Sequence, residues 1–169
     1  MITLKKKKGY KRLDEIQLEL RSTFNQMIKN KGDFYFITIT KTNSQHAKDL
    51  NFLISNHFFN KMWKDYKHTH EFINYLFVIE YPEAISKIDK PIDKLESCRV
   101  HSHILLNTSL SAKTLDYYLN TTFNIKHIKN IPVTNRPDKE QLINYFLKQN
   151  FLEDDCYNYK VVLTKEEKK

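Results

Sequence analysis

Glycine is nearly absent from this chain, and that absence limits what the chain can fold into. Gly9 and Gly32 are the only glycines among 169 residues, and they stand 23 positions apart. A Walker loop or a GxGxxG turn needs several closely spaced glycines, because its backbone must approach a phosphate group closely. Neither motif can be written anywhere in this sequence. If the protein handles phosphate groups, it does so without a glycine-rich loop.

The length and composition indicate one folded domain. A chain of 169 residues with 40% hydrophobic and 13% aromatic residues can bury a core, and it is too apolar for disorder. This length leaves no room for a helicase or ATPase module beside a catalytic domain. No apolar run approaches the roughly 20 residues of a membrane span, and the opening MITLKKKK lacks the apolar core of a signal peptide. We therefore expect a cytoplasmic protein with no membrane partner.

The two cysteines predict neither a zinc site nor a disulfide. Cys98 and Cys156 lack CxxC spacing, and no secretory feature accompanies them. We expect both to be ordinary thiols.

The positive charge is concentrated near the N-terminus. Residues 1–31 hold nine Lys or Arg against three acidic residues, which accounts for +6 of the formal net charge of +8. A lysine-rich arm attracts polyanions through charge and counterion release, without reading a base sequence. A solvated tail would have the same composition, so both interpretations stay open for this segment.

Hydrophobic periodicity predicts alternating helices and strands. Helices are expected over residues 10–30, 46–66, 111–122 and from Pro137 onward, with Asp138 as the cap of the last one. Strands are expected over residues 34–40, 75–81, 99–107, 127–133 and 157–163. The charged segment 82–97 is expected to be a loop. This order predicts an α+β fold with a mainly antiparallel, ferredoxin-like or RRM-like sheet of about five strands packed with helices. We expect residues 1–31 to form a basic helical extension, 32–164 the main domain and 165–169 a frayed tail.

The most specific local feature is the pair His101 and His103 on an expected strand. Residues i and i+2 of a strand share a face at roughly 6–7 Å between Cα atoms, so two imidazoles can converge on one cation. Cys98 has the opposite parity and is not expected to join them. Two surface histidines on a half-exposed strand remain the alternative explanation.

A carboxylate would complete such a site. Glu80 ends an apolar strand, and a neighbouring antiparallel strand could bring it beside the histidine pair; Glu83 and Glu96 are competing candidates. Two imidazoles and one carboxylate leave coordination positions open, which suits Mn²⁺ or Mg²⁺ better than a closed zinc site.

A third feature is Tyr145-Phe-Leu-Lys148 on the last expected helix. Tyr145 and Lys148 lie about 60° apart on the helical wheel, and Tyr145 falls on the polar side rather than at the centre of the apolar face. A tyrosine with a lysine one turn away suits a phenolate that attacks a phosphodiester, because the ammonium can stabilise the developing charge.

Together these residues resemble the HUH endonucleases, in particular the single-tyrosine initiators of rolling-circle replication. In that family a first strand motif, a carboxylate, His-x-His and Tyr-x-x-Lys follow in this order. Phe36-Ile-Thr-Ile-Thr40 resembles the first motif, and Val78-Ile-Glu80 resembles the strand that supplies the carboxylate. Three departures stand out: Ser102 replaces a usually hydrophobic residue, residues 82–98 form a long connection, and Gln141 stands where two-tyrosine initiators have their other nucleophile.

The resemblance implies metal-dependent nicking and joining of single-stranded DNA at a plasmid or viral replication origin. His101, His103 and Glu80 would hold Mn²⁺ or Mg²⁺. Tyr145 would form a 5′-phosphotyrosine link, and Lys148 would assist as charge develops on the phosphate. A host or separate helicase would be a further partner.

Other functions fit the same sequence. A transposase or a mobilisation relaxase would carry the same residues and use the same chemistry. The sequence indicates a one-tyrosine enzyme, with Tyr117 and Tyr118 as further candidate nucleophiles besides Tyr145. A non-catalytic nucleic-acid binder would instead stack bases on an open sheet and bind phosphates with the basic arm. The Tyr-x-x-Lys helix favours an enzyme, because a stacking module has no use for it.

Overall fold

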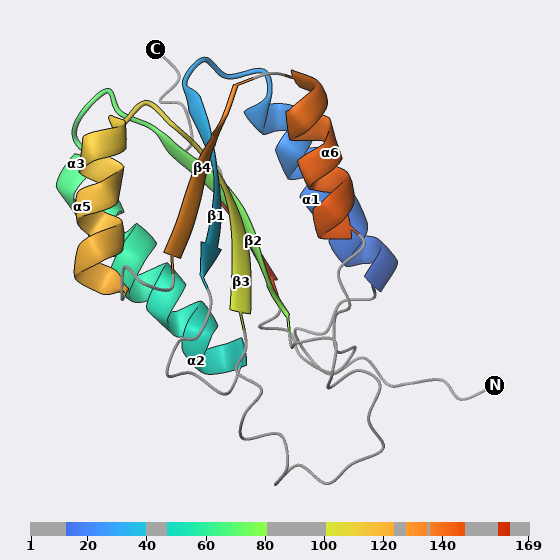
Figure 1. Ribbon diagram of the computed structural model, residues 1–169, viewed down its shortest axis with the longest axis horizontal. Coiled ribbons are helices and arrows are strands. Elements are labelled where there is room, and N and C mark those ends of the chain that lie inside the picture. The colour runs from blue at the N-terminus through green and yellow to red at the C-terminus, as the bar shows by residue number, and fades with distance from the viewer. Residues whose placement is uncertain are drawn as a thin grey trace, which may run out of the picture.

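A computed structural model describes residues 13–39, 47–80, 101–123, 128–134, 136–147 and 159–162 of the chain. Its helices are α1 (Leu13–Met27), α2 (Ala47–Phe52), the π-helical η1 (Leu53–Phe59), α3 (Asn60–Tyr66), α5 (Ala112–Thr122) and α6 (Arg136–Leu147). Its strands are β1 (Asp33–Ile39), β2 (Ile73–Glu80), β3 (His101–Thr108), β4 (Ile128–Val133) and β5 (Tyr159–Val162). The strands form a central layer with helices on both sides (Figure 1).

The strands form one sheet in the order β4-β1-β3-β2-β5, and every neighbouring pair is antiparallel. The succession β1, α2–η1–α3, β2, β3, α5, β4 is a split βαβ arrangement of ferredoxin-like type. The short β5, of four residues, extends the sheet beyond β2. The expected α+β class with a mainly antiparallel sheet is therefore confirmed.

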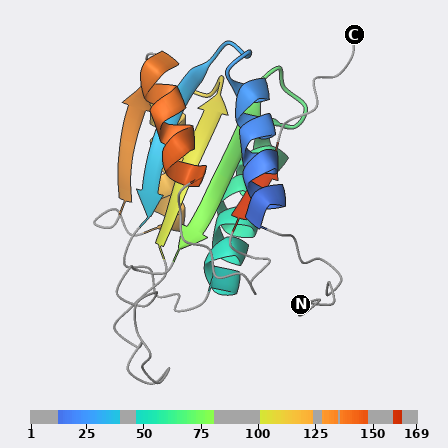
Figure 2. The same ribbon diagram turned by 90° about the vertical axis from the view of Figure 1, so that its right-hand side faces the viewer.

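Two cores lie on opposite faces of this sheet, because successive strand residues point to opposite sides. We call them the α5 core, beneath α2, η1, α3 and α5, and the α1–α6 core, beneath α1 and α6 (Figures 1 and 2). In β1 the alternation sends Ile37 and Ile39 into the α5 core and Phe34 into the α1–α6 core. β3 is buried along nearly its whole length, as a strand covered on both faces must be.

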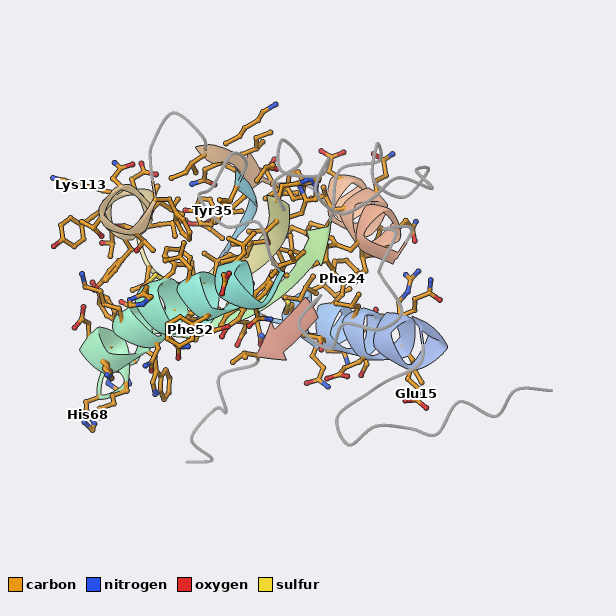
Figure 3. All side chains as sticks on the ribbon, turned by 90° about the horizontal axis from the view of Figure 1, so that it is seen from below. Glu15, Phe24, Tyr35, Phe52, His68 and Lys113 are labelled. Atoms are coloured by element: carbon orange, nitrogen blue, oxygen red, sulfur yellow. The ribbon has the colours of Figure 1, made fainter. Side chains whose placement is uncertain are left out.

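Helix α1 packs on the sheet through one apolar stripe. Leu20, Phe24 and Met27 recur at helical spacing and are almost fully buried in the α1–α6 core. Figure 3 shows Phe24 on the side of α1 that faces the strands, and Glu15 on the outer side. Residues 1–12, which carry most of the basic arm, lie outside the described residues.

Gly32 occupies a position that requires glycine. Its φ is +117°, and a Cβ built there would lie 2.5 Å from Cζ of Phe72 and 2.9 Å from the carbonyl oxygen of Thr108. Any side chain at this position would strain the structure, because of both the backbone conformation and the close approach of these atoms. One of the chain's two glycines therefore forms the turn between α1 and β1.

Two helix starts can be compared with the sequence, which predicted a helix from residue 111 and a cap at Asp138. Ser111 caps α5, and its Oγ accepts a hydrogen bond from the backbone N–H of Thr114 at 3.2 Å. The cap expected at Asp138 is wrong, because α6 already begins at Arg136 and Asp138 lies in its first turn. A carboxylate there still favours the helix, since it faces the positive end of the helix dipole. In the part of the chain that the structure describes, no helix is both long and apolar enough to cross a membrane.

Candidate metal and nucleophile site

Strand β3 presents His101 and His103 side by side on one face. The two ring centroids lie 5.3 Å apart, with the ring planes at 82°. His101 is half-buried, and His103 is 7% exposed. The two imidazoles therefore lie next to each other on one face, as the strand alternation predicts. Burial of His103 does not fit the alternative of two surface histidines.

His103 is held by two side chains of the neighbouring strand β1. Thr38 is its direct cross-strand partner, and Oγ1 of Thr38 lies 3.2 Å from Nδ1 of His103 in a hydrogen bond. The Phe36 ring stacks on the imidazole with the centroids 5.6 Å apart and the planes at 9°. The sequence singled out neither residue as a contact of His103. The alternation of β1 in the sequence places Phe36 and Thr38 on one face of that strand. Only the pairing of β1 with β3 shows that both side chains contact His103.

Ser102, between the histidines, points into the opposite core. It is fully buried, and its Oγ donates a hydrogen bond to the carbonyl oxygen of Val78 at 2.9 Å. A buried hydroxyl costs little when a backbone carbonyl accepts its proton. A serine can therefore occupy this position without disturbing the face that carries the histidines.

The backbone of β2 brings Glu80 to the histidine strand. Glu80 is paired with His101 in the β2–β3 register, and Val78 is paired with His103. The side chain of Glu80 lies outside the described residues, as do the whole of Glu83 and Glu96. Among the side chains that the structure describes, no third His, Cys, Asp or Glu joins the histidine pair in a metal-binding group.

Helix α6, which carries Tyr145, lies over the histidine face of the sheet (Figure 2). Ile143 and Phe146 are fully buried in the α1–α6 core. The Phe146 ring meets Phe36 edge-on, with the centroids 6.0 Å apart. The backbone of Tyr145 belongs to this helix, but its side chain and the whole of Lys148 lie outside the described residues.

The stack Phe146–Phe36–His103 joins the helix of the candidate nucleophile to a candidate metal ligand. Each ring comes from a different element, namely α6, β1 and β3. Aromatic pairs in parallel or edge-on geometry are worth about 0.5–1.5 kcal/mol beyond their buried area. These ring contacts therefore pack the helix whose backbone includes Tyr145 against the face of the sheet that carries His103.

Two further tyrosines lie on the other side of the sheet. Tyr117 and Tyr118 belong to α5, which covers the α5 core rather than the histidine face (Figure 1). The Tyr118 hydroxyl donates a hydrogen bond to a carboxylate oxygen of Asp65. Burial and this hydrogen bond raise the pKa of Tyr118 above its usual value. A raised pKa disfavours the phenolate, so Tyr118 is poorly suited to nucleophilic attack.

The chain was compared with protein-family models, with curated proteins and with solved structures, and no match was found. What the site can do is therefore judged from its own residues. The described donors are two imidazoles on one strand face; imidazole is a common ligand of divalent cations, and an added carboxylate would suit Mn²⁺ or Mg²⁺.

Proposed function

We propose that this protein nicks and rejoins single-stranded DNA through a tyrosine nucleophile, as a single-tyrosine initiator of rolling-circle replication of the HUH endonuclease type. The observation that carries the proposal is the shared face of the sheet. His101 and His103 lie on it with their rings in contact, and α6 with Tyr145 packs over it through Phe146. The packing of α6 on this face supports the proposal, because the backbone of Tyr145 belongs to that helix.

In this proposal His101, His103 and Glu80 hold Mn²⁺ or Mg²⁺. The backbone register supports Glu80 as the carboxylate, because it is the cross-strand partner of His101. A divalent ion at such a site polarises the scissile phosphate and neutralises its developing charge. This role replaces the glycine-rich loop that the chain lacks.

Tyr145 is the proposed nucleophile. Its phenolic oxygen forms a bond to phosphorus, and the bond from phosphorus to the 3′ oxygen of the preceding nucleotide breaks. The proton lost by the phenol is balanced by the proton that the 3′ oxygen gains. The phosphoester is retained as a 5′-phosphotyrosine, so the reverse reaction can rejoin the strand. Lys148 stabilises the charge that develops during attack.

The alternatives differ in how well they fit the fold. A transposase or relaxase shares every catalytic residue, and only the DNA substrate separates them from an initiator. A non-catalytic module that stacks bases on an open sheet fits less well, because helices cover both faces of this sheet (Figures 1 and 2). The Phe34 ring of β1, for example, is only 2% exposed, and Nζ of Lys139 lies 4.0 Å from its centroid, so this aromatic ring is covered by α6.

The substrate is proposed to be single-stranded origin DNA, with the basic residues near the N-terminus adding sequence-independent attraction to phosphates. A host or separate helicase that unwinds the duplex is the proposed further partner. The DNA substrate and the helicase partner both follow from the proposed reaction.

The test is a covalent adduct with a DNA probe. A pool of single-stranded oligonucleotides of random sequence, labelled at the 3′ end, is incubated with the protein and Mn²⁺ and then separated under denaturing conditions. Attack by Tyr145 leaves the 3′ portion of the strand on the protein, so we expect a labelled protein band. Tyr145→Phe should abolish the band, whereas Tyr117→Phe, a matched variant on α5, should retain it. An undiminished band in Tyr145→Phe would refute the assignment.

A further inference from the structure

We propose that the DNA strand reaches the histidine pair across β4, and that Lys129 and Ile131 bind it there. We call Phe36, Thr38, Lys129 and Ile131 the β4 margin of the histidine face. The inference deepens the proposed function and rests on it in one respect, namely that single-stranded DNA is the ligand of this face. It gives a role to β4, on which the sequence predicted no functional residue.

The strand register places the β4 margin beside the histidines. Thr38 is the direct cross-strand partner of both His103 and Lys129. One row further along the sheet, Phe36 is the partner of Ile131. Direct partners in an antiparallel pair have neighbouring Cβ atoms on the same face of the sheet. Lys129 and Ile131 therefore belong to the face that carries His103.

The packing of β4 agrees with this register. Val133 is buried in the α1–α6 core, and Ile131 and Lys129, two and four positions before it, share its face. Ile128, of opposite parity, packs on the α5 core. Two independent observations thus place the exposed residues of β4 on the histidine side.

The row that contains His103 becomes more exposed toward β4. Val78 of β2 is fully buried, and its partner His103 is nearly so. Thr38 of β1 is half-buried, and Lys129 of β4 is exposed. Along this row the candidate site is closed toward β2 and open toward β4.

The neighbouring row shows the same change. Leu76 of β2 and its partner Leu105 of β3 are fully buried. Phe36 is half-buried, and Ile131 is 41% exposed. β4 also forms one border of the sheet (Figure 2). Among the strands that the structure describes, β4 is therefore the one over which a ligand can approach the histidine face.

The chemistry of the β4 margin suits a nucleic-acid strand. The Lys129 ammonium stands on a flexible stem and can bind a phosphate as a point charge. Ile131 offers an exposed apolar surface to the adjoining base or sugar. Two strand spacings of about 4.8 Å separate Lys129 from His103, and phosphates follow one another at about 3.4 Å along each strand of a duplex. At such a spacing, a strand with one phosphate at the histidines carries further phosphates over Lys129.

The first test measures DNA binding by fluorescence anisotropy with a fluorescein-labelled pool of single-stranded oligonucleotides of random sequence. Every protein carries Tyr145→Phe, which removes the proposed nucleophile, and Mn²⁺ is held constant. Lys129→Ala should weaken binding about two- to five-fold, because one ion pair with a phosphate is lost. It should also lower the slope of log affinity against log salt concentration by about 0.7 in magnitude. Lys129→Arg keeps the charge and should keep both quantities.

The matched control is Lys113→Ala. Lys113 is an exposed lysine of α5, which covers the opposite face of the sheet (Figure 3). Its loss removes the same charge and should leave the affinity and the salt slope nearly unchanged. Equal losses in Lys113→Ala and Lys129→Ala would overturn the inference, and so would an undiminished affinity in Lys129→Ala.

The second test places a negative charge on the β4 margin. Ile131→Glu should weaken binding of the same pool at least as much as Lys129→Ala, because the carboxylate repels phosphates. The control is Tyr117→Glu, which adds the same charge at an exposed position of α5 and should bind as its parent does. Thermal unfolding shows that both variants are folded. Equal affinities of Ile131→Glu and Tyr117→Glu would overturn the inference.

Failure of the inference and failure of the proposed function give different results. A protein that binds the pool through Lys129 and Ile131 but forms no covalent adduct would refute the nicking function and leave the β4 margin as a DNA-binding surface. A protein that forms the adduct, and forms it equally well in Lys129→Ala and Ile131→Glu, would overturn the role of the β4 margin alone.

Discussion

The ring of Phe146 packs edge-on against the ring of Phe36, with the planes at 86° and the centroids 6.0 Å apart. Phe146 is fully buried, whereas its helix neighbours Gln141 and Asn144 are exposed. This contact fastens the C-terminal half of α6 to the strand that lies beside β3. It is therefore the described contact that most directly places the helix of Tyr145 on the histidine face.

The first prediction concerns this contact. Phe146→Ala should lower the free energy of unfolding by about 3–5 kcal/mol, because it leaves a cavity in the α1–α6 core. Phe146→Leu should cost less, since it keeps most of the apolar volume. Urea unfolding measures both. The control is Phe52→Ala, which removes a side chain that is 57% exposed and should change stability by no more than about 0.5 kcal/mol. Equal effects at the two positions would show that α6 is not anchored as described.

The second prediction concerns the serine between the histidines. Ser102→Ala should lower stability by about 1 kcal/mol, because the hydrogen bond to the carbonyl oxygen of Val78 is lost. It should leave the Mn²⁺ affinity of the histidine face unchanged, since Ser102 points into the opposite core. Urea unfolding and calorimetry on the same sample separate the two quantities. A large loss of Mn²⁺ affinity would contradict the assignment of Ser102 to the opposite face.

The third prediction concerns Gly32. Gly32→Ala should lower stability by about 1–3 kcal/mol, because it adds a Cβ at φ +117° against Phe72 and a backbone carbonyl. The adjacent Lys31→Ala, at an exposed position, is the matched control and should be nearly neutral. Thermal unfolding of both variants checks this, and an equally stable Gly32→Ala would contradict the described turn.

The fourth prediction concerns alkaline pH. Burial raises the pKa of Tyr75 above its usual value of 10.0, and the buried ring stacks on Phe59 at 3.5 Å. The folded state therefore keeps this proton at a pH where the unfolded chain releases it. The resulting stability is fully present below about pH 10 and is lost as the pH rises above it. Urea unfolding at about pH 8 and about pH 11 measures how far the free energy of unfolding falls between the two pH values. This fall should be smaller for Tyr75→Phe than for the wild type. An equal decline would contradict the burial of this hydroxyl.

Local patterns in the sequence predicted much of the fold. The alternation in β1 and the spacing of Leu20, Phe24 and Met27 in α1 are visible in short windows, because each reflects one element against one core. The same reasoning placed His101 and His103 on one face. The π-helical segment η1 could not be predicted, since the shift from i→i+4 to i→i+5 hydrogen bonds depends on how neighbouring elements pack.

The contacts that hold the site depend on strand pairing across long sequence separations. Thr38 and His103 stand 65 residues apart, and nothing local to either residue specifies the register that makes them partners. The edge-on contact between Phe36 and Phe146 likewise depends on where α6 docks. The sequence thus indicated His101 and His103 as candidate metal ligands, but not the residues that contact the His103 ring.

The central claim is that Tyr145 becomes covalently linked to DNA, and peptide mapping of the adduct tests it most directly. Trypsin should release residues 140–148 as one peptide whose only tyrosine is Tyr145, and residues 114–126 as another that contains Tyr117 and Tyr118. After the DNA is trimmed by nuclease, mass spectrometry of the wild-type adduct should find the nucleotide on the peptide 140–148. A nucleotide on the peptide 114–126, or on neither peptide, would contradict the account.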